Sequence, residues 1–184
     1  MNYLALLKGI NQGKHHRIKM TELSHLFESL GFKEVKTFQQ EGNVIFTSEK
    51  DEFTIRQLIE REIFIVYNYV VPVIIRTDNE IADLIRNCPF SKDNEKKSKL
   101  FDVSLYVSFL KYEPKQERLN QLVTREWETY SVYVNHIYFY LDGAYINSIL
   151  ARDLQNIEVH STIRNWATIK KLYKLLKSIE KKVE

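Results

Sequence analysis

The sequence predicts an α+β fold made of two ferredoxin-like (βαββαβ) units with antiparallel sheets, followed by a C-terminal helix. Residues 1–76 read as strand, helix, hairpin, helix and strand, which is the order of the ferredoxin-like split motif. Residues 101–160 largely repeat this order, so we expect an internal duplication. The 184 residues are 44% apolar and carry a net charge of only +3, a balance that predicts a folded chain rather than a disordered one.

The first strand and helix have the most regular patterns. Tyr3–Leu7 is apolar throughout and stops at Gly9, which is typical of a strand buried on both faces. Thr21 and Gly31 are placed to cap the two ends of the helix that follows. Its apolar residues recur at helical spacing and are Leu23, Leu26, Phe27 and Leu30.

A hairpin, a second helix and an edge strand complete the first unit. Two β-prone runs within residues 35–47 flank Glu41-Gly42-Asn43, a turn in which glycine can take positive φ. Asp51 is a natural N-cap for the next helix. The β-branched run Tyr69–Ile75 contains Pro72, which lacks a ladder donor, so we expect this strand at a sheet edge.

The predicted boundary between the two units is a charged stretch. Residues 91–99 hold six charged side chains and no apolar one, as in a linker or mobile loop. We therefore expect an N-terminal subdomain over 1–90 and a C-terminal one over 100–184. The elements expected in the second are a strand at Phe101–Leu110, a helix from Pro114 to Trp127, a hairpin of Ser131–Val134 and Ile137–Leu141, a helix at Ala144–Leu154, a short strand or connection at Asn156–His160, and a helix from about Asn165 to Lys182.

Composition narrows the class of protein. The single cysteine, Cys88, excludes an internal disulfide and cannot by itself build a thiolate metal site. No apolar run reaches the length of a membrane span, and the first residues lack the pattern of a signal peptide, so we expect a cytoplasmic protein. His15 and His16 are neighbours among basic residues that would repel a cation. We predict neither a metal site nor a cofactor.

Two loops are predicted to meet at one end of the first sheet. The first and third strands of a split βαβ motif are antiparallel neighbours, so the loop over residues 8–14 lies beside residues 40–43. Glycines expose backbone N–H groups there, and amide and ammonium side chains add donors, which suits an anion such as phosphate. The alternative is that both segments are ordinary turns. The candidate ligand-binding residues are Lys8, Asn11, Lys14, Gln40 and Asn43.

Several motifs resemble an uncharacterised bacterial family, domain of unknown function 1697. They are MNYLALLKGINQG, KMTELSHLFESLGF, VKTFQQEGNVIF, Cys88-Pro89-Phe90 and TIRNWATIKKL. The resemblance implies an α+β protein of ferredoxin-like units and no established activity. It also implies two departures, because Glu41 replaces a small serine and Ala167 replaces an asparagine. A ligand held at those positions would differ from the family's or bind more weakly.

The TIRNW motif suggests a second part of the site. Thr162 could cap a helix whose first turn holds Arg164 and Asn165, and a guanidinium at a helix N-terminus favours anions. The alternative is that Arg164 pairs with an acidic residue and Asn165 satisfies a backbone group. Trp166 is expected in the core.

The C-terminal segment from residue 161 has seven basic and two acidic residues, a net charge of +5. Such a lysine face could bind nucleic acid, but a solvated face is the usual case and no RNA-binding strand signature is present, so nucleic acid is not favoured. A membrane partner is not expected. The tyrosine-rich run around Tyr138 alternates as a half-buried hairpin does.

Three functions are consistent with these patterns. The first is a binding module for a small anionic, phosphate- or nucleotide-like ligand, held by the two loops together with Arg164 and Asn165. The second is a protein-interaction or homodimerisation module that uses the sheet edge at Pro72 or the tyrosine-rich face. The third is an enzyme in the same pocket, with Lys8 or Arg164 stabilising charge and Glu41 or a histidine as base. No catalytic constellation accompanies the third.

Overall fold

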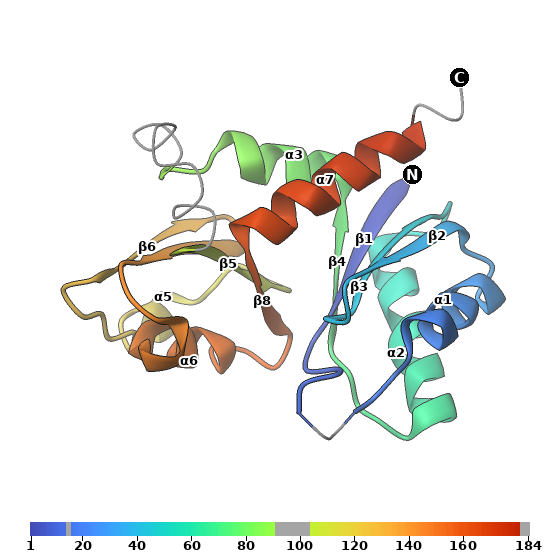
Figure 1. Cartoon of the computed structure of the whole chain (residues 1–184), viewed down its shortest axis with the longest axis horizontal. Helices are drawn as coiled ribbons and strands as arrows, with labels where there is room; N and C mark the ends of the chain where they lie inside the picture. The colour runs from blue at the N-terminus through green and yellow to red at the C-terminus, as the bar shows by residue number, and fades with distance from the viewer. Residues whose placement is uncertain (14–15, 91–103, 181–184) are drawn as a thin grey trace. The chain divides into compact units, whose positions relative to one another are not determined.

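The computed structural model describes residues 1–13, 16–90 and 104–180, in which the chain divides into two units (Figure 1). Unit 1 comprises residues 1–81 and 172–184, and unit 2 comprises residues 82–171. Two helices, α3 (Asp78–Arg86) and α7 (Trp166–Glu180), contribute residues to both units. The predicted linker at 91–99 lies outside the described residues, so this boundary stays a prediction.

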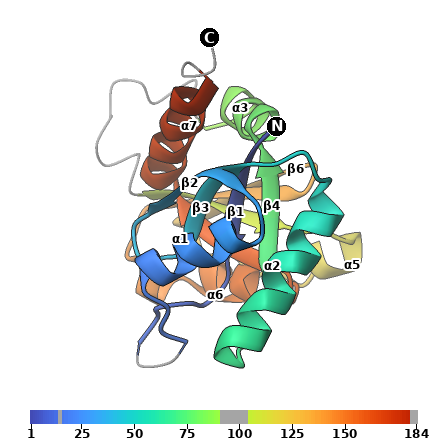
Figure 2. The same ribbon diagram turned by 90° about the vertical axis from the view of Figure 1, so that its right-hand side faces the viewer.

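Unit 1 contains a complete βαββαβ motif. Its elements are β1 (Asn2–Leu7), α1 (Met20–Ser29), β2 (Lys33–Phe38), β3 (Asn43–Thr47), α2 (Glu52–Tyr67) and β4 (Val73–Thr77). The strands form an antiparallel sheet in the order β2-β3-β1-β4, with α1 and α2 over the same face (Figure 2). The predicted fold of the first half is therefore confirmed, including β4 at a sheet edge.

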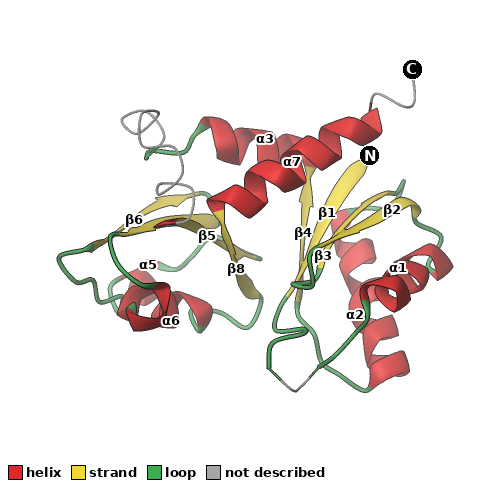
Figure 3. Ribbon diagram, in the orientation of Figure 1, coloured by secondary structure: helices red, strands yellow, loops and turns green. Residues whose placement is uncertain are grey.

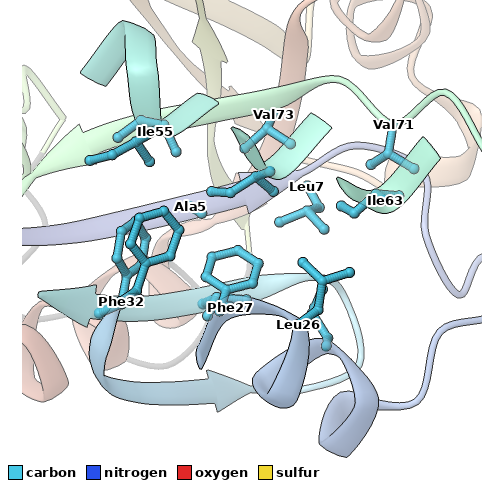
Figure 4. Packing of buried hydrophobic residues seen from close by; sticks show 14 of the residues in the cluster. Ala5, Leu7, Leu26, Phe27, Phe32, Ile55, Ile63, Val71 and Val73 are labelled. Carbon is cyan, nitrogen blue, oxygen red and sulfur yellow. The ribbon is translucent and has the colours of Figure 1, made fainter. Parts of the chain in front are cut away.

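The core of unit 1 lies between the sheet and its two helices. Alternate residues of β1, namely Tyr3, Ala5 and Leu7, belong to one buried cluster with apolar side chains of α1 and α2 (Figure 4). Leu4 and Leu6 point to the opposite face, where each is at most 1% exposed. The expectation that β1 is buried on both faces is thus confirmed.

The ends of the helices in unit 1 match the sequence only in part. Asp51 caps α2, because its Oδ1 accepts the Thr54 N–H at 3.0 Å. Gly31 follows α1 at φ +83° as expected, whereas the N-cap of α1 is Lys19 and not Thr21. Pro72 precedes β4 instead of lying within it, and its carbonyl accepts the Lys8 N–H at 3.0 Å.

Unit 2 repeats the same architecture with shorter helices (Figure 3). Its elements are β5 (Leu105–Leu110), α5 (Gln116–Leu119), β6 (Glu128–Tyr133), β7 (His136–Leu141), the 3₁₀ turn η1 (Tyr145–Asn147), α6 (Ile149–Gln155) and β8 (Ser161–Asn165). The order β6-β7-β5-β8 corresponds strand by strand to that of unit 1. Two ferredoxin-like units with a C-terminal helix are therefore present, as predicted.

Two predicted elements of unit 2 were wrong. The helix expected from Pro114 to Trp127 is a single turn, and the side chains beyond it pack against the core from irregular backbone. The last strand is Ser161–Asn165 rather than Asn156–His160, so the TIRN segment is extended and α7 begins at Trp166.

The two units also resemble each other at single residues in the last strand of each. Arg76 in β4 and Arg164 in β8 are both buried, at 1% and 5% exposure. The guanidinium of each donates to the carbonyl of the preceding residue, at 2.7 and 2.8 Å. The next residue in each case, Thr77 or Asn165, caps the following helix by accepting a backbone N–H. The last strand and the start of the next helix are thus stabilised by the same kinds of hydrogen bond in both units.

Candidate functional site

The two loops predicted to meet in unit 1 are in contact. In the antiparallel register of β1 and β3, Leu6 pairs with Asn43, and the Leu7 N–H donates to the Gly42 carbonyl at 2.9 Å. The segment leaving β1 therefore lies against the turn that enters β3. This juxtaposition follows from the ferredoxin-like strand order.

Asn11 fixes the conformation of the β1–α1 loop. Its Nδ2 donates to the Ile18 carbonyl and to the Gln40 carbonyl, each at 2.9 Å, while its Oδ1 accepts the Ile18 N–H at 2.9 Å. Its φ of +56° is one that asparagine tolerates better than most residues. One side chain thus closes the loop on itself and joins it to the neighbouring turn.

Gly42 and Asn43 form the inner part of the turn. Gly42 has φ +75°, and a Cβ there would stand 2.8 Å from Leu7 Cβ and from Ile10 Cδ1. Asn43 is fully buried, and its Nδ2 donates to the Phe38 carbonyl across the β2–β3 hairpin at 3.1 Å. Both residues therefore shape the turn, and Gln40 is the exposed residue of the predicted set in this segment.

Positive charge is concentrated in the same loop. Residues 8–19 contain four basic side chains and no acidic one. Lys8 is half-buried at the end of β1, and this burial lowers the pKa of its ammonium group. Arg17 donates to the Gly13 carbonyl at 3.1 Å. Lys14, a predicted ligand residue, lies outside the described residues.

A row of aromatic rings lies beside the loop. The His16 ring is 4.6 Å from that of Tyr69, and Tyr69 stacks on Tyr67 at 6.2 Å between ring centroids. The Tyr67 hydroxyl also donates to Glu22 at 3.4 Å. The sequence alone does not indicate this contact, since the residues come from opposite ends of the motif. The contact between His16 and Tyr69 depends on the tertiary arrangement of α2 and β4, because Tyr69 lies between these two elements.

Arg164 and Asn165 lie in unit 2, and the structure corrects their predicted conformation. They belong to β8 and not to the first turn of a helix. The Arg164 guanidinium also donates to the Thr162 hydroxyl at 2.7 Å. Asn165 is the N-cap of α7, with its Oδ1 accepting the Thr168 N–H at 2.8 Å, whereas Thr162 was expected to be the cap. Asn165 therefore satisfies a backbone group, which was the alternative interpretation of its role.

Three further residues noted in the sequence have contacts or burial that fit a role in the fold. Cys88 is buried, and the Tyr138 hydroxyl, also buried, donates to the Leu84 carbonyl at 2.6 Å. Among the α7 lysines, Lys177 lies 3.9 Å from the Asp78 carboxylate. Within the described ranges, no group of three His, Cys, Asp or Glu residues is placed to hold a metal ion.

Unit 2 also has a surface pocket that the sequence analysis did not identify. It has a volume of about 450 Å³, and its lining includes Arg125, Trp127, Asp142 and Gly143. Arg125 and Trp127 fall in the segment that was expected to be a helix, so the sequence did not indicate that their side chains lie together.

In the part of the chain that the structure describes, no helix is both long and apolar enough to cross a bilayer.

The comparisons with known proteins give a family and a fold. The family model described as "Protein of unknown function (DUF1697)" matches residues 1–140. The conserved bacterial protein SP0830 from Streptococcus pneumoniae has a solved structure similar to this one, with a TM-score of 0.74 and 19% sequence identity. The similarity covers 95% of this chain and 98% of the other. No curated protein matches the sequence.

Proposed function

We propose that this chain, which belongs to the DUF1697 family, is a cytoplasmic binding module for a small anionic ligand with a phosphate- or nucleotide-like group. The part of the site that we assign lies in unit 1, on the β1–α1 loop and the turn before β3. The observation that carries the proposal is the β1–α1 loop, which Asn11 fixes against the turn before β3 and which carries Lys8 and Arg17.

The electrostatics of this loop favour an anion. Lys8, Lys14 and Arg17 attract negative charge and disfavour a cation. Lys19 is paired with Glu22 at 3.4 Å, and Glu41 of the adjoining turn offsets one of the positive charges. The lowered pKa of Lys8 means that burial penalises its ammonium form. An anion close to Nζ would offset this penalty and raise the pKa. Binding would therefore be favoured because the anion stabilises the ammonium form that burial destabilises in the unliganded protein.

The residues of the predicted set divide by role. Lys8 and Gln40 are the proposed contacts to the ligand, and the part of Lys14, which lies outside the described residues, stays a prediction. Asn11 and Asn43 are positioning residues, because their amides bond to backbone groups of the loop and the hairpin. The participation of Arg164 and Asn165 in the same site stays a prediction.

A thermal-shift experiment with matched variants tests the proposal. The full chain, Lys8→Met and Lys33→Met are titrated with inorganic phosphate and with adenosine monophosphate at constant ionic strength. Lys33 pairs with Thr47, at the end of β3 away from Asn43, so its variant removes one charge from the other end of the sheet. Ligand at one hundred times its Kd should stabilise the native state by about 2.7 kcal/mol.

Stabilisation of the wild type and of Lys33→Met, but much less of Lys8→Met, is the expected result. Equal stabilisation of all three proteins would place the binding elsewhere. A lack of stabilisation by either anion at millimolar concentration would reject an anion-binding function for this loop.

A second candidate function is protein interaction through an apolar surface of unit 1. Phe64, Ile65 and Val66 near the end of α2 are 51–60% exposed, and Val70 is 77% exposed. Contiguous apolar patches are typical of interaction sites, and several exposed apolar side chains lie in this short stretch of the chain. Sedimentation velocity of the wild type and Ile65→Lys tests this candidate: loss of self-association in the variant would support it, and a monomeric wild type would exclude homodimerisation.

A further inference from the structure

The pocket of unit 2 is built around a tryptophan that lies against a glycine. Trp127 precedes β6, and its carbonyl accepts the Asp142 N–H at 2.9 Å where β7 ends. A Cβ at Gly143 would lie 3.0 Å from Trp127 Cε3 and 3.2 Å from Cζ3. Any larger residue at Gly143 would therefore push the indole away. Trp127 itself is half-buried, so part of the ring borders the pocket.

Arg125 is held in place from three directions. Its guanidinium carbon lies 5.7 Å from the centroid of the Trp127 ring, within the range of a cation–π interaction. Its Nη1 donates to the Asn147 carbonyl at 3.1 Å. Its backbone N–H donates to Oε2 of Glu128 at 2.8 Å, and Glu128 is buried. An exposed arginine with this many restraints loses little conformational entropy when it binds a ligand.

Arg125 lines two adjoining pockets that differ in their other charged residues. The first, of about 450 Å³, is also lined by Trp127 and Asp142. The second, of about 320 Å³, shares Arg125 and adds Tyr145 and Arg152. Negative charge is thus disfavoured beside Asp142. It is less disfavoured in the second pocket, where Arg125 and Arg152 are both present and Arg152 Nε lies 3.5 Å from the Asp153 carboxylate.

We propose that these two pockets form a ligand site, independent of the loop in unit 1, for a small molecule in which a carboxylate or phosphate is joined to a planar aromatic group. The anionic group lies between Arg125 and Arg152, where a guanidinium can form two parallel hydrogen bonds to it. The planar group lies against the exposed part of Trp127. Asp142 in the first pocket, and the two arginines in the second, favour this orientation.

NMR of the tryptophan indole N–H groups tests the site in the full chain. The sequence has two tryptophans, and Trp166 is 4% exposed, so Trp127 is the one that a ligand in the pocket contacts. The probes are benzoate and adenosine monophosphate, which separate the carboxylate and phosphate forms of the ligand, with acetate and inorganic phosphate as probes that lack the planar group. Trp127→Phe assigns the resonance.

We expect a saturable shift of the Trp127 resonance with benzoate, adenosine monophosphate or both, and weaker binding of the probes without a ring. Arg125→Gln should weaken binding about tenfold or more. Arg118→Gln, which removes an exposed charge of the same unit outside both pockets, should leave the affinity unchanged. Lys8→Met should also leave it unchanged, which separates this site from that of unit 1.

Two results would overturn the proposal. One is the absence of a saturable Trp127 shift with every probe, and the other is unchanged affinity in Arg125→Gln. Thermal melting of each variant confirms that it is folded. Arg125→Lys, which keeps the charge but loses the planar fork, serves if the glutamine variant does not fold; affinity equal to the wild type in Arg125→Lys would likewise count against the site.

Discussion

Replacing Gly42 with alanine should destabilise the protein more than the same change at any open glycine. Gly42 has φ +75°, and left-handed backbone costs a residue with a Cβ about 1–2 kcal/mol. The new methyl would stand 2.8 Å from Leu7 Cβ, which belongs to a strand and cannot retreat easily. Overpacking of this kind costs about 1–3 kcal/mol. The two terms together give a loss of roughly 2–5 kcal/mol.

Gly9→Ala is the matched control. Gly9 has a similar φ of +72°, but among the described residues no atom lies within 4 Å of the position that its Cβ would take. Its expected loss is therefore the backbone term alone, about 1–2 kcal/mol. Urea unfolding of the wild type and both variants gives the difference, provided that the m-value is unchanged. An equal loss in the two variants would refute the argument that close packing against Leu7 and Ile10 requires glycine.

Three further predictions follow from the contacts of single residues. Asn11→Ala should cost about 1–3 kcal/mol in urea unfolding, because two backbone groups of Ile18 lose their partner; a neutral result would mean that the loop does not depend on Asn11. Asn165→Ala should cost about 1 kcal/mol by removing the cap of α7, while Asn165→Asp should keep most of it. Since burial lowers the pKa of Lys8, the unfolded state binds more protons between that pKa and the ordinary value, so wild-type stability should rise relative to Lys8→Met as the pH increases through this window. If the difference in the free energy of unfolding between the wild type and Lys8→Met does not change between pH 7 and about 10.5, the burial of the Lys8 ammonium group does not affect stability as argued.

The sequence predicts an element correctly where its apolar pattern has one explanation and the packing agrees with it. The apolar run of β1 and the helical spacing in α1 identified elements whose buried positions are those expected, such as Leu23 and Phe27. The meeting of the two loops could also be predicted, because strand order in the split motif leaves no other arrangement. The fold class, and the contact between the β1–α1 loop and the turn before β3, therefore follow from the sequence alone.

The failures come from segments whose apolar spacing has two explanations. Leu119, Leu122 and Trp127 recur as in a helix, yet only Leu119 is helical, and the others reach the same core from irregular backbone. Thr162 and Asn165 are both good capping residues, and the sequence does not show which one begins α7. Extended pairing of Ser161–Asn165 with β5 decided the question, and this pairing depends on tertiary structure.

The most direct test of the proposed function is an amide ¹H–¹⁵N titration of the full chain with inorganic phosphate. Binding at the β1–α1 loop predicts saturable shifts concentrated at residues 8–13, 16–19 and 39–43, which contain Gly9, Asn11 and Gly42. Shifts confined to other segments, or none at saturating phosphate, would contradict an anion site at this end of unit 1.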